Sequence, residues 1–168
     1  MAGYDFRLRS PWRPLPLALY GQFIGEDEAG GLPAKFLGQL GAESWASTPW
    51  GALRGHFEYA DTSCNFTRSR PMLGCAYRNH LYPQGYTFRG HSIGHAMGGD
   101  GRMYSLGSLL VRPNGDSLSV LLRKVELNRG GAASNRLKNV DVQYNRPFAR
   151  GELRLGLGYN DFDIEPAD

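Results

Sequence analysis

Residues 151–160, GELRLGLGYN, decide the fold class of this chain. The odd-numbered positions from 153 to 159 carry leucine or tyrosine, and the even-numbered positions carry glutamate, arginine, glycine or asparagine. An apolar side chain at every second position is typical of a β-strand with one apolar and one polar face, because successive side chains of a strand point to opposite sides. The stretch therefore predicts a strand that is apolar on one face only.

The same alternation recurs along the chain, and no sustained helical period accompanies it. Tyr4, Phe6 and Leu8, for example, alternate with charged residues in the N-terminal stretch. The sequence thus predicts an all-β fold of meandering antiparallel strands, most of them about 7–11 residues long, near the length that a tilted membrane strand needs. The predicted strands are 3–9, 15–25, 33–43, 52–60, 103–112, 117–127, 138–146 and 151–160.

The predicted connections alternate between tight turns and longer loops. Proline ends strand pairing in 10–14, and the pair Asn114-Gly115 suits a two-residue hairpin turn. Numbering the strands in order places the tight connections on one rim, namely 10–14, 44–50, 113–116 and 146–148. The long connections 26–32, 61–101 and 128–137 fall on the opposite rim. Short turns on one rim and long loops on the other are typical of an outer-membrane β-barrel.

Aromatic residues follow the same division. Such residues form girdles where a barrel meets the two membrane surfaces. The tight-turn rim receives Trp12, Trp45 and Trp50, and the loop rim receives Tyr4, Tyr59, Tyr104 and Tyr159. A soluble β-sandwich that binds carbohydrate is the alternative, since it also alternates and buries aromatic residues. Nothing in a sandwich requires the tryptophans to share one rim.

The direction of the strands adds a further expectation. If the tight turns are periplasmic, the first and the last predicted strand both end at the outer rim. Single-chain bacterial barrels normally keep both termini inside, so the chain is expected to be a segment of a larger barrel. An apolar run of about 20 residues, as a membrane helix requires, is absent from the sequence.

Composition excludes several other classes of protein. With 41% hydrophobic residues the chain is not expected to be disordered, and its 23 glycines follow no collagen period. Its 19 basic and 16 acidic residues give a net charge of +3, which is too balanced to predict a nucleic-acid partner. Cys64 and Cys75 suit one disulfide that closes a loop, worth about 3 kcal/mol in the chain-entropy model, although two free thiols are the alternative. A disulfide favours an oxidising compartment.

Several stretches of the chain resemble one known family. They are SPWRPLPLALYGQ at 10–22, FIGEDE at 23–28, EYADT at 58–62 and YTFRGHSIGH at 86–95. In order and spacing these stretches are similar to the Wzi family of capsule assembly proteins, outer-membrane β-barrels of Gram-negative bacteria. The resemblance implies a single partial barrel domain over 1–168, with a long extracellular loop at about 61–101.

The resemblance also implies a function and a location. It implies lectin-like binding and surface attachment of capsular or exported polysaccharide at the bacterial outer membrane, and it implies no enzymatic activity. The expected partners are that polysaccharide and outer-membrane lipid. The barrel is expected to be monomeric and to need no cofactor.

The loop 61–101 carries the candidate binding residues. Aromatic rings pack against the C–H faces of sugars, and arginine forks pair with the carboxylates of acidic capsules. The alternative is a loop that folds back into the barrel, with the same side chains satisfying one another. The candidates are Tyr77, Arg78, His80, Tyr82, Tyr86, Arg89, His91, His95 and Arg102.

Two other kinds of chemistry are weaker hypotheses. His91 and His95 are four residues apart, a spacing that binds metal on a helix, but the surrounding glycines disfavour a helix and a third ligand is not evident. Glu58 and Asp61 would lie on opposite faces of an extended strand, which disfavours paired-carboxylate hydrolysis. No metal site and no catalytic residue is therefore predicted. A hydrolase that uses the histidine-rich loop is the remaining alternative.

Overall fold

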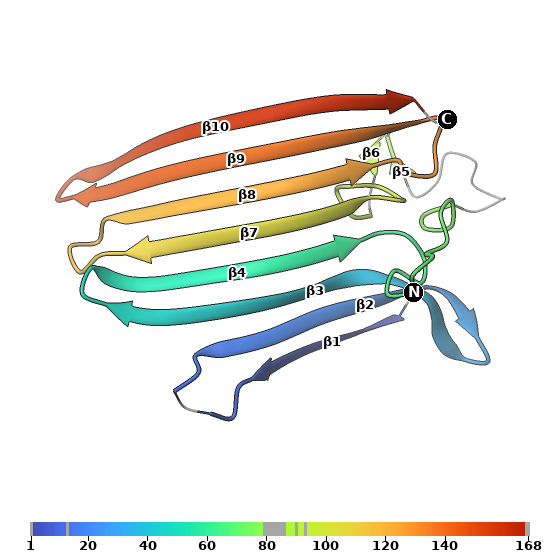
Figure 1. The fold of residues 1–168 in the computed structure, drawn as a ribbon, viewed down its shortest axis with the longest axis horizontal. Helices are drawn as coiled ribbons and strands as arrows, with labels where there is room; N and C mark the ends of the chain where they lie inside the picture. Colours follow the sequence, from blue (N-terminus) through green and yellow to red (C-terminus); the bar gives the residue numbers. More distant parts are fainter. Residues whose placement is uncertain (1, 13, 79–86, 90, 93, 167–168) are drawn as a thin grey trace.

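A computed structural model describes residues 2–12, 14–78, 87–89, 91–92 and 94–166. Eight strands form one antiparallel sheet in chain order, with β1 and β10 at its edges (Figure 1). These strands are β1 (Ala2–Arg9), β2 (Leu17–Ala29), β3 (Leu32–Thr48), β4 (Gly51–Asp61), β7 (Arg102–Val111), β8 (Ser117–Leu127), β9 (Ala133–Phe148) and β10 (Gly151–Pro166). A small hairpin, β5 (Thr87–Phe88) with β6 (His91–Ser92), lies within the connection from β4 to β7.

The predicted all-β meander is confirmed, and each predicted strand has its counterpart in the sheet. The part of the chain that the structure describes contains no helix long and apolar enough to cross a membrane. All four tight turns lie at one end of the sheet, and the long connection from β4 to β7 lies at the other (Figure 1). We call these two ends the turn end and the loop end.

Two connections predicted as long loops are shorter than expected. The 26–32 stretch is a hairpin, because β2 and β3 pair up to a two-residue turn at Gly30 and Gly31, whose φ angles are 61° and 82°. The predicted loop 128–137 is strand from Ala133 onward. The prediction was wrong because it relied on apolar alternation, whereas backbone pairing continues where both faces of a strand meet water.

The two faces of the sheet differ in polarity. Cross-strand pairing places Leu106, Leu122, Val140 and Tyr159 in one row, and all four side chains are exposed, by 53%, 39%, 37% and 65% respectively. We call this side the apolar face. Within the described residues no second sheet covers it. A β-sandwich would bury such a row against its other sheet, so the sandwich alternative is wrong.

An aromatic belt crosses the apolar face at the loop end. The ring centroids of Tyr59 and Tyr104 are 5.2 Å apart, those of Tyr59 and Phe66 6.3 Å, and those of Phe66 and Phe23 5.3 Å. The belt continues through Phe36, 6.2 Å from Phe23, to Tyr4. The belt lies on the same face as the row that begins at Leu106, and closer to the loop end. On a membrane barrel, aromatic residues in this position form the girdle at the membrane surface.

The tryptophans lie at the turn end, but they do not share a face. Trp12 and Trp50 are exposed by 70% and 71%. Trp45 is the register partner of Arg54, and the guanidinium of Arg9 lies 5.8 Å from the centre of its ring, so Trp45 belongs to the polar face. The prediction that all three form one girdle is wrong for Trp45. β3 continues to Thr48, so Trp45 lies within the strand, and the alternation of side chains places it on the polar face.

Candidate functional site

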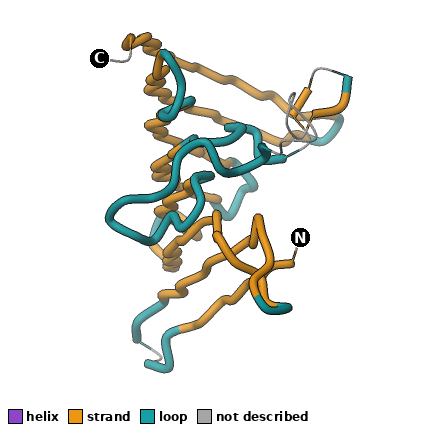
Figure 2. The backbone as a smooth tube through the Cα atoms, turned by 90° about the vertical axis from the view of Figure 1, so that its right-hand side faces the viewer, coloured by secondary structure: helices purple, strands orange, loops and turns teal. Residues whose placement is uncertain are grey.

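Part of the segment between β4 and β7 packs against the polar face at the loop end, while Phe66 of the same segment belongs to the aromatic belt. Figure 2 views the molecule from this end, with the loops in front of the strand ends. Leu37 and Ile24 are register partners on the polar face, and both contact a buried cluster that the loop supplies. Cys64 and Ala76 are the buried loop members of this cluster. The loop therefore has its own apolar anchor on the polar face.

Asp61 fixes the start of the loop. Its carboxylate is fully buried and accepts hydrogen bonds from the Arg129 guanidinium at 2.6 Å and from Arg102 Nε at 3.1 Å. The backbone N–H of Ser63 and the hydroxyl of Tyr59 also donate to it, each at 2.9 Å. Buried charges are stable only when they are paired and hydrogen-bonded in this way. Asp61 thus ties β4, β7 and the connection after β8 together.

The end of the loop is held by a second buried carboxylate. Asp100 is 1% exposed, and its two oxygens accept from the N–H of Gly74 at 2.9 Å. Arg129 contacts this region as well, since its Nε donates to the carbonyl of Asp100 at 3.0 Å. Both acidic residues of 61–101 are therefore buried and hydrogen-bonded.

Cys64 and Cys75 form a disulfide in the structure. Cys64 also pairs with Met72 through two backbone hydrogen bonds of 3.1 and 2.8 Å. The bridge closes the turn that follows Asp61 and lies in the buried cluster with Leu37. It therefore links the outer part of the loop to the polar face.

We expect a thiol-blocking reagent to label neither cysteine in denatured, unreduced protein. After reduction it is expected to label both. Replacing both cysteines with serine should lower the stability of the loop by about 3 kcal/mol, as the chain-entropy model gives for a short loop. Mass spectrometry of the alkylated protein checks the first expectation, and labelling of both thiols before reduction would contradict it.

The structure brings two of the predicted binding residues together. The hydroxyl of Tyr77 accepts a hydrogen bond from the N–H of His95 at 3.2 Å, and the N–H of Tyr77 donates to Glu26 at 3.0 Å. Burial lowers the pKa of His95 and raises the pKa of Tyr77. Both side chains are therefore uncharged at neutral pH.

The remaining candidates are dispersed. Arg102 is paired with the buried Asp61, and Arg78 and Arg89 are exposed on the loop. His91 belongs to β6, but its side chain is not described. The other predicted residues, His80, Tyr82 and Tyr86, lie outside the described residues.

The exposed charges of the loop all have one sign. Residues 62–99 contain four arginines and no aspartate or glutamate. All four arginines, Arg68, Arg70, Arg78 and Arg89, are exposed, and none of the ion pairs among the described residues uses them. We call these four residues the arginine set. The set gives the loop surface a positive charge that no ion pair among the described residues neutralises.

A cavity of about 240 Å³ lies between the loop and the polar face. Tyr77, Gly94 and His95 border it from the loop, and Ile24, Leu37 and Ala60 from the strands. Gln22, Gln39, Gly38 and Thr62 complete its lining. We call it the upper cavity.

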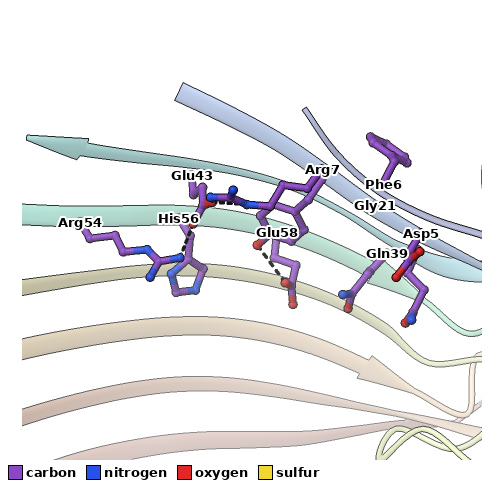
Figure 3. Close-up of a pocket in the computed structure, with 11 residues that line it drawn as sticks. Asp5, Phe6, Arg7, Gly21, Gln39, Glu43, Arg54, His56 and Glu58 are labelled. Atoms are coloured by element: carbon purple, nitrogen blue, oxygen red, sulfur yellow. Dashed lines mark hydrogen bonds and ion pairs between the residues drawn. The ribbon is translucent and has the colours of Figure 1, made fainter. Parts of the chain in front are cut away.

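A larger pocket of about 480 Å³ follows on the polar face. Arg7 and Arg54 pair with Glu43 there, reaching it from opposite sides (Figure 3). Glu58 accepts a hydrogen bond from the Tyr20 hydroxyl at 3.0 Å, and His56 lies beside them. Gln22 and Gln39 line this pocket as well as the upper cavity, so the two are adjacent. We call it the lower pocket.

Sequence reasoning did not select Tyr20, Gln22, Gln39 or His56 as binding residues. The alternation of side chains along the predicted strands could have identified them, since it places all four on the polar face. Glu58 and Asp61 have separate surroundings, with Glu58 in the lower pocket and Asp61 beneath the loop, as their parity predicted. They do not form a carboxylate pair.

Comparison with known proteins gives three consistent matches. The family described as "Capsule assembly protein Wzi" matches residues 1–168. An uncharacterised 55.8 kDa protein of Klebsiella pneumoniae, from the cps region, is 33% identical over 180 residues, which cover 100% of this chain and 34% of the relative. The chain thus spans about a third of that relative.

The third match is a solved structure. It is described as Wzi, an outer membrane protein involved in group 1 capsule assembly in Escherichia coli, and as a carbohydrate-binding β-barrel. The TM-score is 0.82 at 27% sequence identity, with 99% of this chain and 39% of that chain covered. The eight-stranded sheet therefore corresponds to part of the wall of a barrel.

Proposed function

Because this chain belongs to the Wzi family of capsule assembly proteins, we propose that it contributes the wall and the outer loop of a lectin that holds capsular or exported polysaccharide on the cell surface. The barrel stands in the bacterial outer membrane as a monomer. Outer-membrane lipid covers its apolar face, and the loop faces the outside. The protein binds polysaccharide without cleaving it, and it takes no nucleic acid and no cofactor.

The arginine set carries this proposal. Capsular polysaccharides are often acidic, and an arginine fork binds a carboxylate through two parallel hydrogen bonds. Residues 62–99 carry four exposed arginines and no acidic residue, and the two flanking carboxylates, Asp61 and Asp100, are buried, so this surface attracts such a polymer. A long polyanion can contact several of these arginines at once, which raises the overall affinity beyond that of a single contact.

The framework of the loop supports the same function. The disulfide, the buried cluster around Leu37 and the Asp61 network fix residues 61–77 of the loop to the sheet before any ligand arrives. A site that is ordered in advance loses less conformational entropy on binding. Arg89 also lies 5.3 Å from the ring centre of Phe88, which is 62% exposed and offers a stacking surface beside a cation.

The carboxylates of the described sites favour binding over hydrolysis. Glu43 is neutralised by two arginines, Glu58 accepts from Tyr20, and Asp61 is enclosed by its five hydrogen-bond donor groups. A hydrolase needs two carboxylates that face one glycosidic bond. The pairing of each with another side chain supports a structural role for all three.

We expect that replacing Arg68, Arg70, Arg78 and Arg89 with glutamine in the full-length protein weakens binding of an acidic capsular polysaccharide at least tenfold, or about 1.4 kcal/mol. Binding by the parent protein should weaken with added salt, because exposed charges are screened. The measurement is retention of the purified polysaccharide by immobilised protein across a salt series.

The matched control is Arg154→Gln, which removes an exposed arginine from the polar face of β10 and leaves the loop intact. This variant is expected to bind like the parent. Equal retention of the polysaccharide by the parent and by the quadruple variant would contradict the assignment of the arginine set. Absence of polysaccharide binding by the parent would contradict the proposed function itself.

A further inference from the structure

The upper cavity differs in charge from the loop surface above it. Among the described residues, its lining contains no aspartate, glutamate, lysine or arginine. The one titratable base among these lining residues is His95, and burial lowers its pKa, which favours the neutral form. An ion that entered this cavity would lose its hydration without gaining a counter-charge, so the cavity disfavours the acidic sugar residues that suit the arginine set.

The walls of the upper cavity suit an apolar group on a small polar ligand. Ile24, Leu37 and Ala60 provide aliphatic carbon from three neighbouring strands, and Tyr77 closes the cavity from the loop side. Leu37 and Ala60 are each 2% exposed, so they lie at the buried end of the cavity. At about 240 Å³ the cavity is smaller than the roughly 300–1,000 Å³ of pockets that enclose drug-sized ligands. It therefore has room for one sugar residue or its substituent.

Two amides mark the boundary between the upper cavity and the lower pocket. Gln22 and Gln39 are direct register partners on β2 and β3, and both side chains line both spaces. Neither amide makes a side-chain hydrogen bond with another residue in the part of the chain that the structure describes. Each amide offers a carbonyl oxygen and an NH₂ group, which together can bind adjacent hydroxyls of a sugar.

The lower pocket continues this polar surface. Beyond the amides, the lower pocket is lined by Glu58, by His56 and by Glu43, which is ion-paired with Arg7 and Arg54. All of these side chains lie on the polar face of the sheet. Hydrogen-bonding groups of both kinds are thus available to the hydroxyls of further sugar residues. Along the polar face, an apolar cavity is thus followed by an amide pair and then by a polar pocket. This spatial order suits a glycan that carries one apolar substituent near its bound end.

We propose that the upper cavity and the Gln22–Gln39 pair form a second carbohydrate subsite, which takes an uncharged, methyl-bearing sugar residue such as a 6-deoxyhexose or an acetylated sugar. The methyl group occupies the space between Leu37, Ala60 and Tyr77, and the ring hydroxyls bind the two amides. This inference rests on the proposed function and adds to it. The arginine set binds acidic residues outside, and the subsite selects a neutral residue beneath the loop.

The test uses the full-length protein and three soluble probes: the methyl glycoside of L-rhamnose, methyl glucoside and methyl glucuronide. Saturation-transfer NMR measures which protons of each probe contact the protein. We expect the C6 methyl group of the rhamnoside to give the strongest signal, and its affinity to exceed that of the other two at least tenfold. Equal signals from the methyl group and the ring protons, or no preference among the probes, would overturn the inference.

Two variants locate the binding. Gln22→Leu combined with Gln39→Leu removes both amides with little change in volume, and we expect it to reduce rhamnoside affinity at least tenfold. Gln143→Leu is the matched control, since it changes a glutamine on the same face of β9, away from the cavity. If the double variant binds the rhamnoside as the control does, the subsite is not at these amides.

A third variant tests the cavity itself. Ala60→Val narrows the upper cavity by two methyl groups and is expected to reduce rhamnoside binding while the amides remain in place. The two proposals fail separately in these experiments. Polysaccharide retention that depends on the arginine set, with no response to the Gln22 and Gln39 changes, overturns the subsite and leaves the proposed function intact. Rhamnoside binding that depends on Gln22 and Gln39, without any polysaccharide retention, overturns the proposed function and leaves the sugar-binding subsite in place.

Discussion

Asp61→Ala is expected to lower the stability of the outer loop by about 3–5 kcal/mol, the cost of removing one partner from a buried ion pair. The guanidiniums of Arg102 and Arg129 both donate to the Asp61 carboxylate. Without it, the two positive charges remain side by side in a site where their side chains are 28% and 13% exposed. Repulsion and lost hydrogen bonds should then separate the loop from β4.

Limited trypsin digestion of the folded full-length protein measures this effect. Cleavage after Arg68 should be much faster in the variant, because the connection between Arg68 and β4 is released. Asp161→Ala is the control, since Asp161 is exposed and makes a 3.5 Å ion pair with Lys138 on the strands. An exposed pair contributes about 0–1 kcal/mol, so the control should digest like the parent. Equal digestion of both variants would contradict the role of Asp61.

Leu155→Arg is expected to cost about 2–4 kcal/mol of folding free energy in a lipid bilayer, provided that the apolar face contacts lipid near the middle of the membrane. Leu155 lies on β10 within the apolar face and is 56% exposed. The neighbouring Gly156 lies on the polar face, and a Cβ added there would meet no heavy atom within 4 Å. Gly156→Arg is therefore a control that places the same charge one residue further on.

Urea titration of the full-length protein in bilayers, followed by the gel shift between its folded and unfolded forms, gives the two free energies. The arginine at 156 can be hydrated within the polar interior, so we expect it to cost less than about 1 kcal/mol, as for an ordinary exposed substitution. A similar loss for both variants would show that the two faces meet the same environment. The assignment of the apolar face to lipid would then be wrong.

The alternation of residues carries most of the fold. Tyr4, Phe6 and Leu8 predicted the apolar face of β1 correctly, because side-chain direction in a strand follows from position alone. The same rule failed at the loop end of β2 and β3. Pairing there continues as far as Ala29 and Leu32, although the apolar pattern has ended. Backbone hydrogen bonds need no particular side chain, so a sequence pattern does not mark where such a strand stops.

Candidate residues were harder to predict than strands. A loop rich in arginine and aromatic residues was evident from the sequence, and Arg78 and Arg89 are exposed on it. Arg102 has the same chemistry but is paired with a carboxylate that is fully buried. The partners of an arginine depend on which strands pair and in which register, and here the pairing of β4 with β7 joins Asp61 and Arg102, which are 41 positions apart.

The sequence by itself therefore determined the strands, the polarity of their two faces, the rim that carries the long loop and the family of the chain. These properties follow from local periodicity and from the order of the residues. Only the tertiary structure decided that Gln22 faces Gln39, that Tyr77 and His95 cover a cavity above them, and that Asp61 is the buried anchor of the loop. Each of these depends on strand register and on contacts between distant segments, which arise from the packing of the whole sheet and leave no periodic trace in the sequence.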